Sequence, residues 1–292
     1  MPVAIIGSVE NEATARLSDS WRGIGIDAIP LSAWEALDTL GRGDVAVCRL
    51  DVREGVDGVE DGLAALLLLE RRGVRVVNSV RSLLRAHDKL RTARVLQAAS
   101  LPHPQTTHLR PAQGLPAGTR YPIVLKPRFG SWGEDVALCA NSVAASRYLE
   151  RVRDQPWFRR HGALVQEALP SPGYDLRVIV AAGRLVGAAR RIAAPGEWRT
   201  NVSCGGTLQA AAVSDDVAEL ARTAIAVIDG DFMGVDILPA GNSYVVLEVN
   251  AAVDFDETYS LGGRHVDDAS AEALFPARRR HRRHSSHALT HA

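Results

Sequence analysis

Short apolar runs alternate with helix-like patterns through the first hundred residues. The apolar runs have the length of buried strands and lie at residues 3–6, 25–29, 45–50 and 74–77. After Pro30, the sequence Ser-Ala-Trp-Glu at 32–35 has the form of a capping box, which marks the start of a helix. Because strands alternate with helices, this part of the chain predicts a parallel sheet flanked by helices, an α/β domain at residues 1–100.

The pattern changes after a helical stretch that follows Asn78 and contains His87, Asp88 and Lys89. The sequence Leu-Pro-His-Pro at 101–104 must end that helix, because proline removes a backbone donor and disfavours helix in the preceding residue. Strand patterns then follow one another with few helices between them, which predicts antiparallel sheets in an α+β arrangement. The expected strands are 123–127, 136–139, 164–168, 176–180 and 185–190, and the expected helices are 142–153 and 215–228.

Residues 232–250 read as a β-hairpin that gathers three oxygen-bearing side chains. Glu248 and Asn250 are two residues apart in the second arm, so they project from the same face of the strand. Antiparallel pairing with the first arm would place Asp236 beside them. Carboxylate and amide oxygens without histidine or thiolate suit Mg²⁺, which completes its shell with water and substrate phosphates. The hairpin therefore predicts a metal site for a nucleotide, although a Glu-x-Asn tripeptide alone more often points into solvent.

A second candidate site lies upstream, where the apolar run at 121–125 ends in Lys126 and Pro127. A strand would hold the lysine ammonium in place, and the loop at 129–133, which contains two glycines, would let backbone N–H groups approach a phosphate. The order of lysine and glycines is the reverse of a Walker A motif. We therefore predict a phosphate clamp in a different nucleotide-binding fold.

Composition narrows the function classes. The 34 basic and 34 acidic residues balance, so nothing in the overall charge indicates a nucleic-acid or membrane partner. The apolar stretch at 63–69 is too short to span a bilayer. Cys48, Cys139 and Cys204 are widely spaced, which is typical of reduced thiols, and we expect a cytoplasmic protein without disulfides or zinc. Residues 276–292 are basic and nearly free of apolar side chains, so we expect a mobile tail.

Several motifs occur in one order along the chain: Lys-Pro with the Gly-Ser-Trp-Gly loop, then Gln-Glu, Asp-Leu-Arg, Arg-Thr-Asn before Gly-Gly, and finally the Asp and Glu-x-Asn of the hairpin. This series resembles the ATP-grasp carboxylate–amine ligases, most of all the RimK and LysX type. The resemblance extends to about residue 273. It implies an N-terminal parallel α/β domain at 1–100 and an ATP-grasp domain at 101–275. The latter would divide into a lid subdomain at 101–168 and a C-terminal subdomain at 169–275.

The resemblance also implies a role for each motif. Lysines would hold the ATP phosphates and the glycine loop would close on them, backbone groups at 166–169 would meet the adenine, and a carboxylate would accept the ribose hydroxyls. Further residues would line the phosphate and acyl side, and the hairpin would carry the metals, with Glu248 bridging two of them. In chain order the residues concerned are Lys89, Lys126, Gly130, Ser131, Trp132, Gly133, Gln166, Glu167, Asp175, Arg177, Arg190 or Arg191, Arg199, Asn201, Asp236, Glu248 and Asn250.

The expected reaction is amide-bond formation through an acyl phosphate, with release of ADP and phosphate, and with ATP and Mg²⁺ or Mn²⁺ as cofactors. The partners would be a small amino acid and a carboxylate acceptor, which could be an amino acid, a peptide or a carrier-protein C-terminus, and we expect a homo-oligomer. Glu134 and Cys204 stand where related sequences often carry arginine, which weakens the case for an acidic carrier unless Arg199 and Arg264 compensate. Alternatives are a ligase of peptide natural-product or cofactor biosynthesis and a nucleotide-binding module without turnover.

Overall fold

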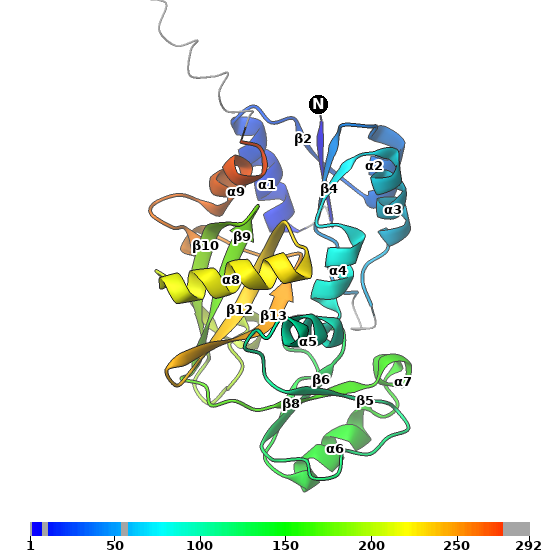
Figure 1. The fold of residues 1–292 in the computed structure, drawn as a ribbon, viewed down its shortest axis with the longest axis vertical. Helices are drawn as coiled ribbons and strands as arrows, with labels where there is room; N and C mark the ends of the chain where they lie inside the picture. The colour runs from blue at the N-terminus through cyan, green and yellow to red at the C-terminus, as the bar shows by residue number, and fades with distance from the viewer. Residues whose placement is uncertain (1, 8–10, 54–57, 277–292) are drawn as a thin grey trace, which may run out of the picture.

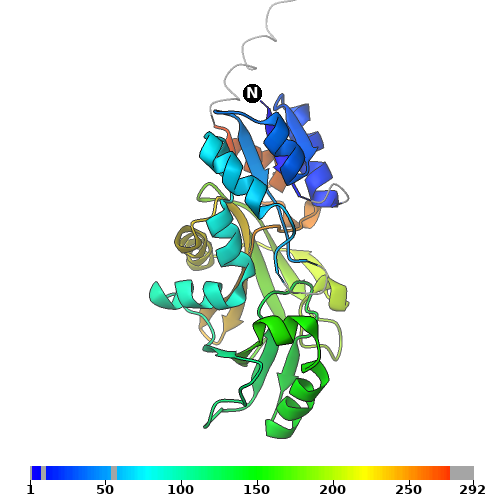
Figure 2. The ribbon, with the colours of Figure 1, turned by 90° about the vertical axis from the view of Figure 1, so that its right-hand side faces the viewer.

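The structure is a computed structural model, and it describes residues 2–7, 11–53 and 58–276. Its elements form three tiers along the long axis of the molecule, each tier built on one β-sheet (Figures 1 and 2). The expected basic tail lies outside the described residues from position 277 onward. Within the described ranges, no helix has the length and apolar character needed to cross a membrane.

The N-terminal tier is the predicted parallel sheet. Its strands run in the order β2-β1-β3-β4, and all of their pairings are parallel. The predicted capping box at Ser32 is present at the start of its second helix. The strands are β1 (Val3–Ile6), β2 (Ala28–Leu31), β3 (Val45–Cys48) and β4 (Arg75–Val77), and the helices are α1 (Glu12–Gly23), α2 (Ala33–Thr39) and α3 (Leu63–Arg72).

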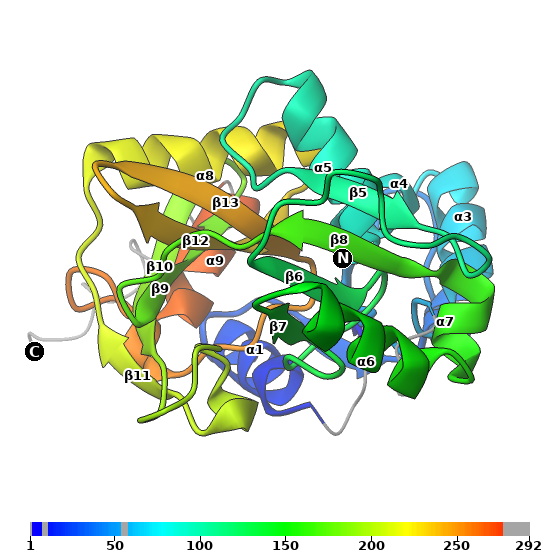
Figure 3. The same ribbon diagram turned by 90° about the horizontal axis from the view of Figure 1, so that it is seen from below.

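The lid tier is a four-stranded antiparallel sheet with a core of its own. Its strand order is β5-β8-β6-β7, and Leu109, Leu125, Tyr148 and Trp157 belong to a core cluster made only of residues from this tier. The elements are β5 (Thr106–Leu109), β6 (Ile123–Pro127), β7 (Ala137–Cys139), β8 (Ala163–Glu167), α6 (Ser142–Val152) and α7 (Pro156–His161). Figure 3 shows this sheet in front of the C-terminal sheet when the molecule is viewed from below.

The C-terminal tier lies between the other two and carries a five-stranded antiparallel sheet in the order β11-β10-β9-β12-β13 (Figure 1). Helix α8 covers this sheet, and α9 returns to pack on α1 of the N-terminal tier. The elements are β9 (Tyr174–Ala181), β10 (Arg184–Ile192), β11 (Thr207–Ala210), α8 (Asp215–Ile228), β12 (Phe232–Ala240), β13 (Ser243–Asn250) and α9 (Val266–Leu274), with short 3₁₀ turns at Val202–Cys204 and Glu257–Tyr259.

The helical stretch expected after Asn78 is two helices, α4 (Val80–His87) and α5 (Lys89–Ala98), and not one. Asp88 ends the first and caps the second, where its side chain accepts a bond from the Leu90 N–H. Both helices pack against α8 and β13 of the C-terminal tier. The break places Lys89 at the N-terminus of α5. The predicted domain boundary at residue 100 stays a proposal.

Asn78 joins the N-terminal and C-terminal tiers. Its side chain is fully buried, and its amide nitrogen donates to the carbonyls of Phe232 (2.7 Å), Cys48 (3.2 Å) and Ala251 (3.4 Å). Its oxygen accepts from the Asp231 and Phe232 N–H groups. These bonds satisfy backbone groups of three segments at a place that water cannot reach.

We expect Asn78→Ala to lower the free energy of unfolding by about 3 kcal/mol, because it leaves several buried backbone groups without partners. The backbone at residue 78 also has a φ of 61°, which asparagine tolerates better than alanine. Urea unfolding would measure the change. The exposed turn residue Asn242 provides the matched control, Asn242→Ala, and a loss no larger than that of the control would contradict this role.

Candidate active site

A cleft of about 550 Å³ takes its lining from the lid sheet and the C-terminal sheet. A second cavity, of about 380 Å³, adjoins it and takes part of its lining from the N-terminal tier. Of the two alternatives Arg190 and Arg191, only Arg191 lines these spaces, because Arg190 stacks on Tyr174. The other predicted site residues each line one or both spaces, with Arg177 and Asn250 only in the second. The residues common to both are Ser131, Trp132, Arg191, Asn201 and Glu248.

The predicted hairpin is confirmed and forms one wall where the two spaces meet. In the register of β12 and β13, Asp236 lies directly opposite Glu248, and Asn250 lies opposite Gly234. Asp236 is buried, while Glu248 and Asn250 are partly exposed. The Asn250 amide nitrogen is buried without a hydrogen-bond partner. Glu248 therefore lies beside Asp236, which lines the cleft, and on the same strand as Asn250, which lines the second cavity. That the three bind one metal site stays a prediction.

A buried network of charges supports this wall. Arg177 donates two hydrogen bonds to the carboxylate of Asp236, at 2.8 and 2.9 Å. Arg191 donates one bond to Asp236 (2.7 Å) and two to Asp175 (2.7 and 2.6 Å), and the Thr200 hydroxyl also donates to Asp175 (2.6 Å). Each buried charge is thus paired, which offsets its loss of hydration.

The network keeps Asp236 negatively charged and engages both oxygens of Asp175. Burial alone would raise the pKa of Asp236, but the charges of Arg177 and Arg191 hold it well below its usual value. Asp236 is therefore ionised. Both oxygens of Asp175 already bond to buried partners, so its contacts favour holding Arg191 in place. The ribose contact that the resemblance implies for Asp175 stays a prediction that these bonds do not support.

Two lysines, Lys89 and Lys126, line the cleft close to Glu248 of the hairpin. Lys89, the first residue of α5, donates to the Gly130 carbonyl (2.6 Å) and pairs with Glu248 (3.2 Å). Lys126 is buried on β6, and burial lowers its pKa to about 8 despite the attraction of Glu248. Two ammonium groups beside carboxylates make a strongly charged end of the cleft, which suits a polyanion that brings its own cation.

The loop at 130–133 is held by contacts on both sides. The Ser203 hydroxyl donates to the carbonyl of Trp132 (2.6 Å), and Arg199 donates to the carbonyl of Gly133 (2.9 Å). Gly133 has a φ of 78°, and a Cβ there would lie 3.1 Å from the side-chain oxygen of Asn201. Glycine is therefore required at 133 both by the backbone and by the close approach of the neighbouring loop.

The far end of the cleft is apolar. Residues 166–169 cross it at the end of β8, and the Gln166 side chain is tied to the Thr106 hydroxyl at 2.8 Å. The apolar side chains around it suit a flat aromatic ring, whose polar edge would meet backbone groups of this segment. They are Val124, Val136, Leu138, Leu169, Leu238 and Leu247.

Several residues of the site were missed in the sequence. Asp51 lines the second cavity, and Asp88 is bound by Arg128 through two bonds of 2.7 and 2.6 Å. His87 lies 3.8 Å from Asp51. No local spacing pattern marks these residues, because tertiary packing alone brings them to the site. The helix-cap preference of aspartate was the one usable signal for Asp88.

The donor set at the hairpin fits a hard divalent cation. Among the described residues, no group of three His, Cys, Asp or Glu side chains could hold a metal ion, and the predicted set has two carboxylates and one amide. The partly exposed carboxylate of Glu248 is available, and Asn250 would contribute its side-chain oxygen, while its buried unpartnered atom is the NH2 nitrogen, which cannot bind a cation. Asp236 would have to share an oxygen that now bonds to an arginine. Oxygen-only donors are typical of Mg²⁺ and Mn²⁺ sites.

Comparison with known proteins places this geometry in a family. The model of the RimK-like ATP-grasp domain matches residues 86–270. The chain is 31% identical over 225 residues to the "Probable alpha-L-glutamate ligase" of Rhodopirellula baltica, an alignment that covers 74% of this chain and 55% of that relative. The chain thus spans about half the length of this relative.

A second relative is similar in sequence to this chain, and a solved structure is similar to it in fold. The chain is 30% identical over 220 residues to the "Glutamate--LysW ligase ArgX" of Sulfurisphaera tokodaii, which covers 74% of this chain and 76% of the relative. The crystal structure of a RimK-domain ATP-grasp protein from Sphaerobacter thermophilus has a TM-score of 0.68 and 23% identity, and covers 94% of this chain and 98% of the other. The chain therefore belongs to the RimK-like ATP-grasp family.

Proposed function

We propose that this protein activates a substrate carboxylate with ATP and joins it to an amine supplied from the second cavity. The observation that carries the proposal is the meeting of the two spaces at Glu248 and Arg191, between the lysine end of the cleft and Arg177. A triphosphate that enters from one side and a carboxylate that enters from the other would meet there. The identity and coverage of the two relatives support the same reaction class.

Each part of the cleft has a task in this proposal. The adenine lies in the apolar end against residues 166–169, and Lys89 and Lys126 bind the phosphates under the loop at 130–133. Asp236, Glu248 and Asn250 would hold Mg²⁺, or Mn²⁺ in its place, and the bound metal would neutralise charge on the phosphates. Arg191 and Asp175 keep the Asp236 carboxylate in position.

Phosphorylation solves the chemical problem of a carboxylate, which is a poor electrophile because it is negatively charged. Transfer of the γ-phosphoryl group gives an acyl phosphate and ADP, and attack by the amine then releases phosphate. Charge spreads over the phosphoryl oxygens during the transfer, so fixed cations such as Lys126 and Arg177 stabilise it. The loop at 130–133 excludes water, which would otherwise hydrolyse the acyl phosphate.

The carboxylate substrate is proposed to be a small amino acid or a short peptide. The relatives carry names of glutamate ligases and of a LysW ligase. Here Glu134 lines the cleft and Cys204 lies beside the loop, in contact with the carbonyl of Trp132. Neither residue offers positive charge to an acidic carrier protein, and the net charge of the chain is zero.

Hydroxylamine trapping tests the proposal. Purified protein would be incubated with ATP, Mg²⁺ and a panel of amino acids and acidic peptides, first with hydroxylamine and then with amino acids as the nucleophile. Hydroxylamine converts an acyl phosphate to a hydroxamate, which is measured by colour and mass. We expect hydroxamate with equal amounts of ADP and phosphate. Release of AMP and pyrophosphate would overturn the acyl-phosphate route, and ATP binding without any hydroxamate would indicate a binding module.

A further inference from the structure

The second cavity is lined by both arginines and carboxylates. Arg177 and Arg191 line it near the metal-binding hairpin. Carboxylates line it elsewhere, and they come from α1, from the segment after β3 and from the loop after β13. They are Glu12, Asp51, Asp254 and Asp256. Because Arg177 and Arg191 already pair with Asp236 and Asp175, the charge that this lining leaves to a substrate is negative, which favours a cationic group over an acidic one.

Asp51 differs from the other carboxylates by its burial and by its unused oxygen. Asp254 is 54% exposed and bonds to Asn11, while Asp256 caps the 3₁₀ turn at Thr258. The Asp51 side chain is 25% exposed, and its Oδ1 atom accepts from the Val52 N–H at 2.6 Å and from Ser131 at 3.4 Å.

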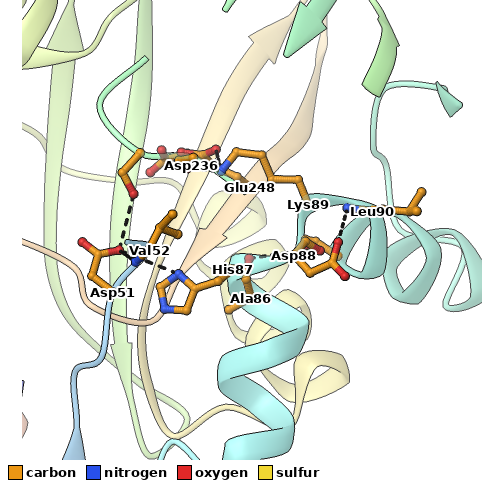
Figure 4. A network of polar contacts seen from close by, with 12 residues as sticks. Asp51, Val52, Ala86, His87, Asp88, Lys89, Leu90, Asp236 and Glu248 are labelled. Carbon is orange, nitrogen blue, oxygen red and sulfur yellow. Dashed lines mark hydrogen bonds and ion pairs between the residues drawn. The ribbon is translucent and has the colours of Figure 1, made fainter. Parts of the chain in front are cut away.

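No group in the described part of the chain donates a hydrogen bond to the other oxygen of this carboxylate, Oδ2. Figure 4 shows the Asp51 carboxylate beside His87. The Ser131 hydroxyl bonds to its Oδ1 atom. Among the described residues, Asp51 therefore has one oxygen with hydrogen-bond donors and one without a donor.

His87 does not neutralise Asp51. Its Nε2 atom lies 2.8 Å from the Leu50 carbonyl and can bond to it only by donating a proton, so the neutral ring presents an unprotonated Nδ1 to Asp51 at 3.8 Å. Burial lowers the pKa of His87, which keeps the ring neutral. The charged groups that remain near this pair are Arg49, Glu60, Lys89 and Glu248. Arg49 and Lys89 have acidic partners of their own in Asp254 and Glu248.

We propose that Asp51 binds the ammonium group of the amine substrate through its free Oδ2 oxygen. The second cavity would then take a primary amine with its ammonium group at Asp51, close to the place where the two spaces meet. The ammonium gives up one proton to Asp51 or to solvent before its nitrogen attacks the acyl phosphate, and the departing phosphate takes the second. The inference rests on the proposed function, because an amine site matters only if the cleft makes an activated carboxylate. Asp51 would then be a residue of the N-terminal tier that determines which amine is bound. It would have no role in the transfer of phosphate from ATP to the carboxylate.

The test compares two nucleophiles in Asp51→Asn. Asparagine keeps the Oδ1 acceptor for Val52 and Ser131 but replaces the free charged oxygen with an amide nitrogen, which repels an ammonium group. Hydroxylamine is largely neutral at pH 7 and small, so it needs no carboxylate to bind it. The matched control is Asp61→Asn, an 88% exposed aspartate of the same tier that pairs with Arg53. The carboxylate substrate is the compound that yields a hydroxamate in the trapping experiment proposed for the function. The amine substrate is the common amino acid that the wild-type protein joins to this carboxylate fastest.

We expect Asp51→Asn to raise the KM for the amino acid by about tenfold to a hundredfold, because a charge-assisted hydrogen bond is lost. Its hydroxamate rate should fall by much less, and Asp61→Asn should change neither value. An equal fall in both reactions would overturn the inference, since Asp51 would then act on the loop through Ser131. An unchanged KM would also overturn it. Failure of the proposed function looks different, because the wild type itself would then make no hydroxamate.

Discussion

Glu248→Gln is expected to lower turnover by about a thousandfold while the fold is retained. Glu248 faces Asp236 across the hairpin, pairs with Lys89 and lines both the cleft and the second cavity. Glutamine has nearly the same shape, so the change removes the charge and one strong metal donor without opening a cavity. Steady-state release of ADP and phosphate at saturating ATP would measure the loss.

A titration with Mg²⁺ separates the metal role from a general loss of activity. If Glu248 binds the metal, the variant should need a higher Mg²⁺ concentration for half of its remaining rate. Glu219→Gln is a suitable control, because Glu219 lies on the exposed face of α8 and, among the described residues, bonds to its neighbours Arg222 and Thr223 alone. Turnover equal to that of the control would remove Glu248 from the proposed site.

The hairpin could be predicted from local alternation, and the lysine strand from a short continuous apolar run, which is buried along its whole length. Asp236, Glu248 and Asn250 follow from the two-residue period of a strand and from one turn, and the observed register agrees. The apolar run before Lys126 corresponds to β6, which spans the predicted residues 123–127. Such signals survive in a single sequence because the residues that create them are neighbours along the chain.

The charge network and the amine end of the site could not be predicted in the same way. Arg191 reaches Asp236 across 45 positions, and Ser131 reaches Asp51 across 80 positions. The interruption of the helix at Asp88 was also missed, because the sequence around it has no glycine or proline. These features depend on how the three sheets stack, and that information is not contained in any local period.

Lys126→Met is the second change with a large expected effect, and we expect it to lower kcat/KM for ATP by about a hundredfold. Lys126 is buried on β6 and close to Glu248, Lys89 and Asp236. Methionine keeps most of the apolar stem and removes only the ammonium group, so packing in the lid sheet is preserved. ATP binding can be followed by the fluorescence of Trp132 and Trp198, which both line the cleft.

The pH dependence of ATP binding provides an independent test of the same lysine. Because burial lowers the pKa of Lys126 to about 8, the free protein loses this charge as the pH rises above 8. The bound triphosphate favours the charged form, so binding above pH 8 must take up one proton, and affinity should fall by about tenfold per pH unit toward pH 10. The fall should be absent in Lys126→Met, whose affinity is already low at pH 7. A wild-type affinity that stays constant from pH 7 to 10 would show that Lys126 does not hold the phosphates as an ammonium ion.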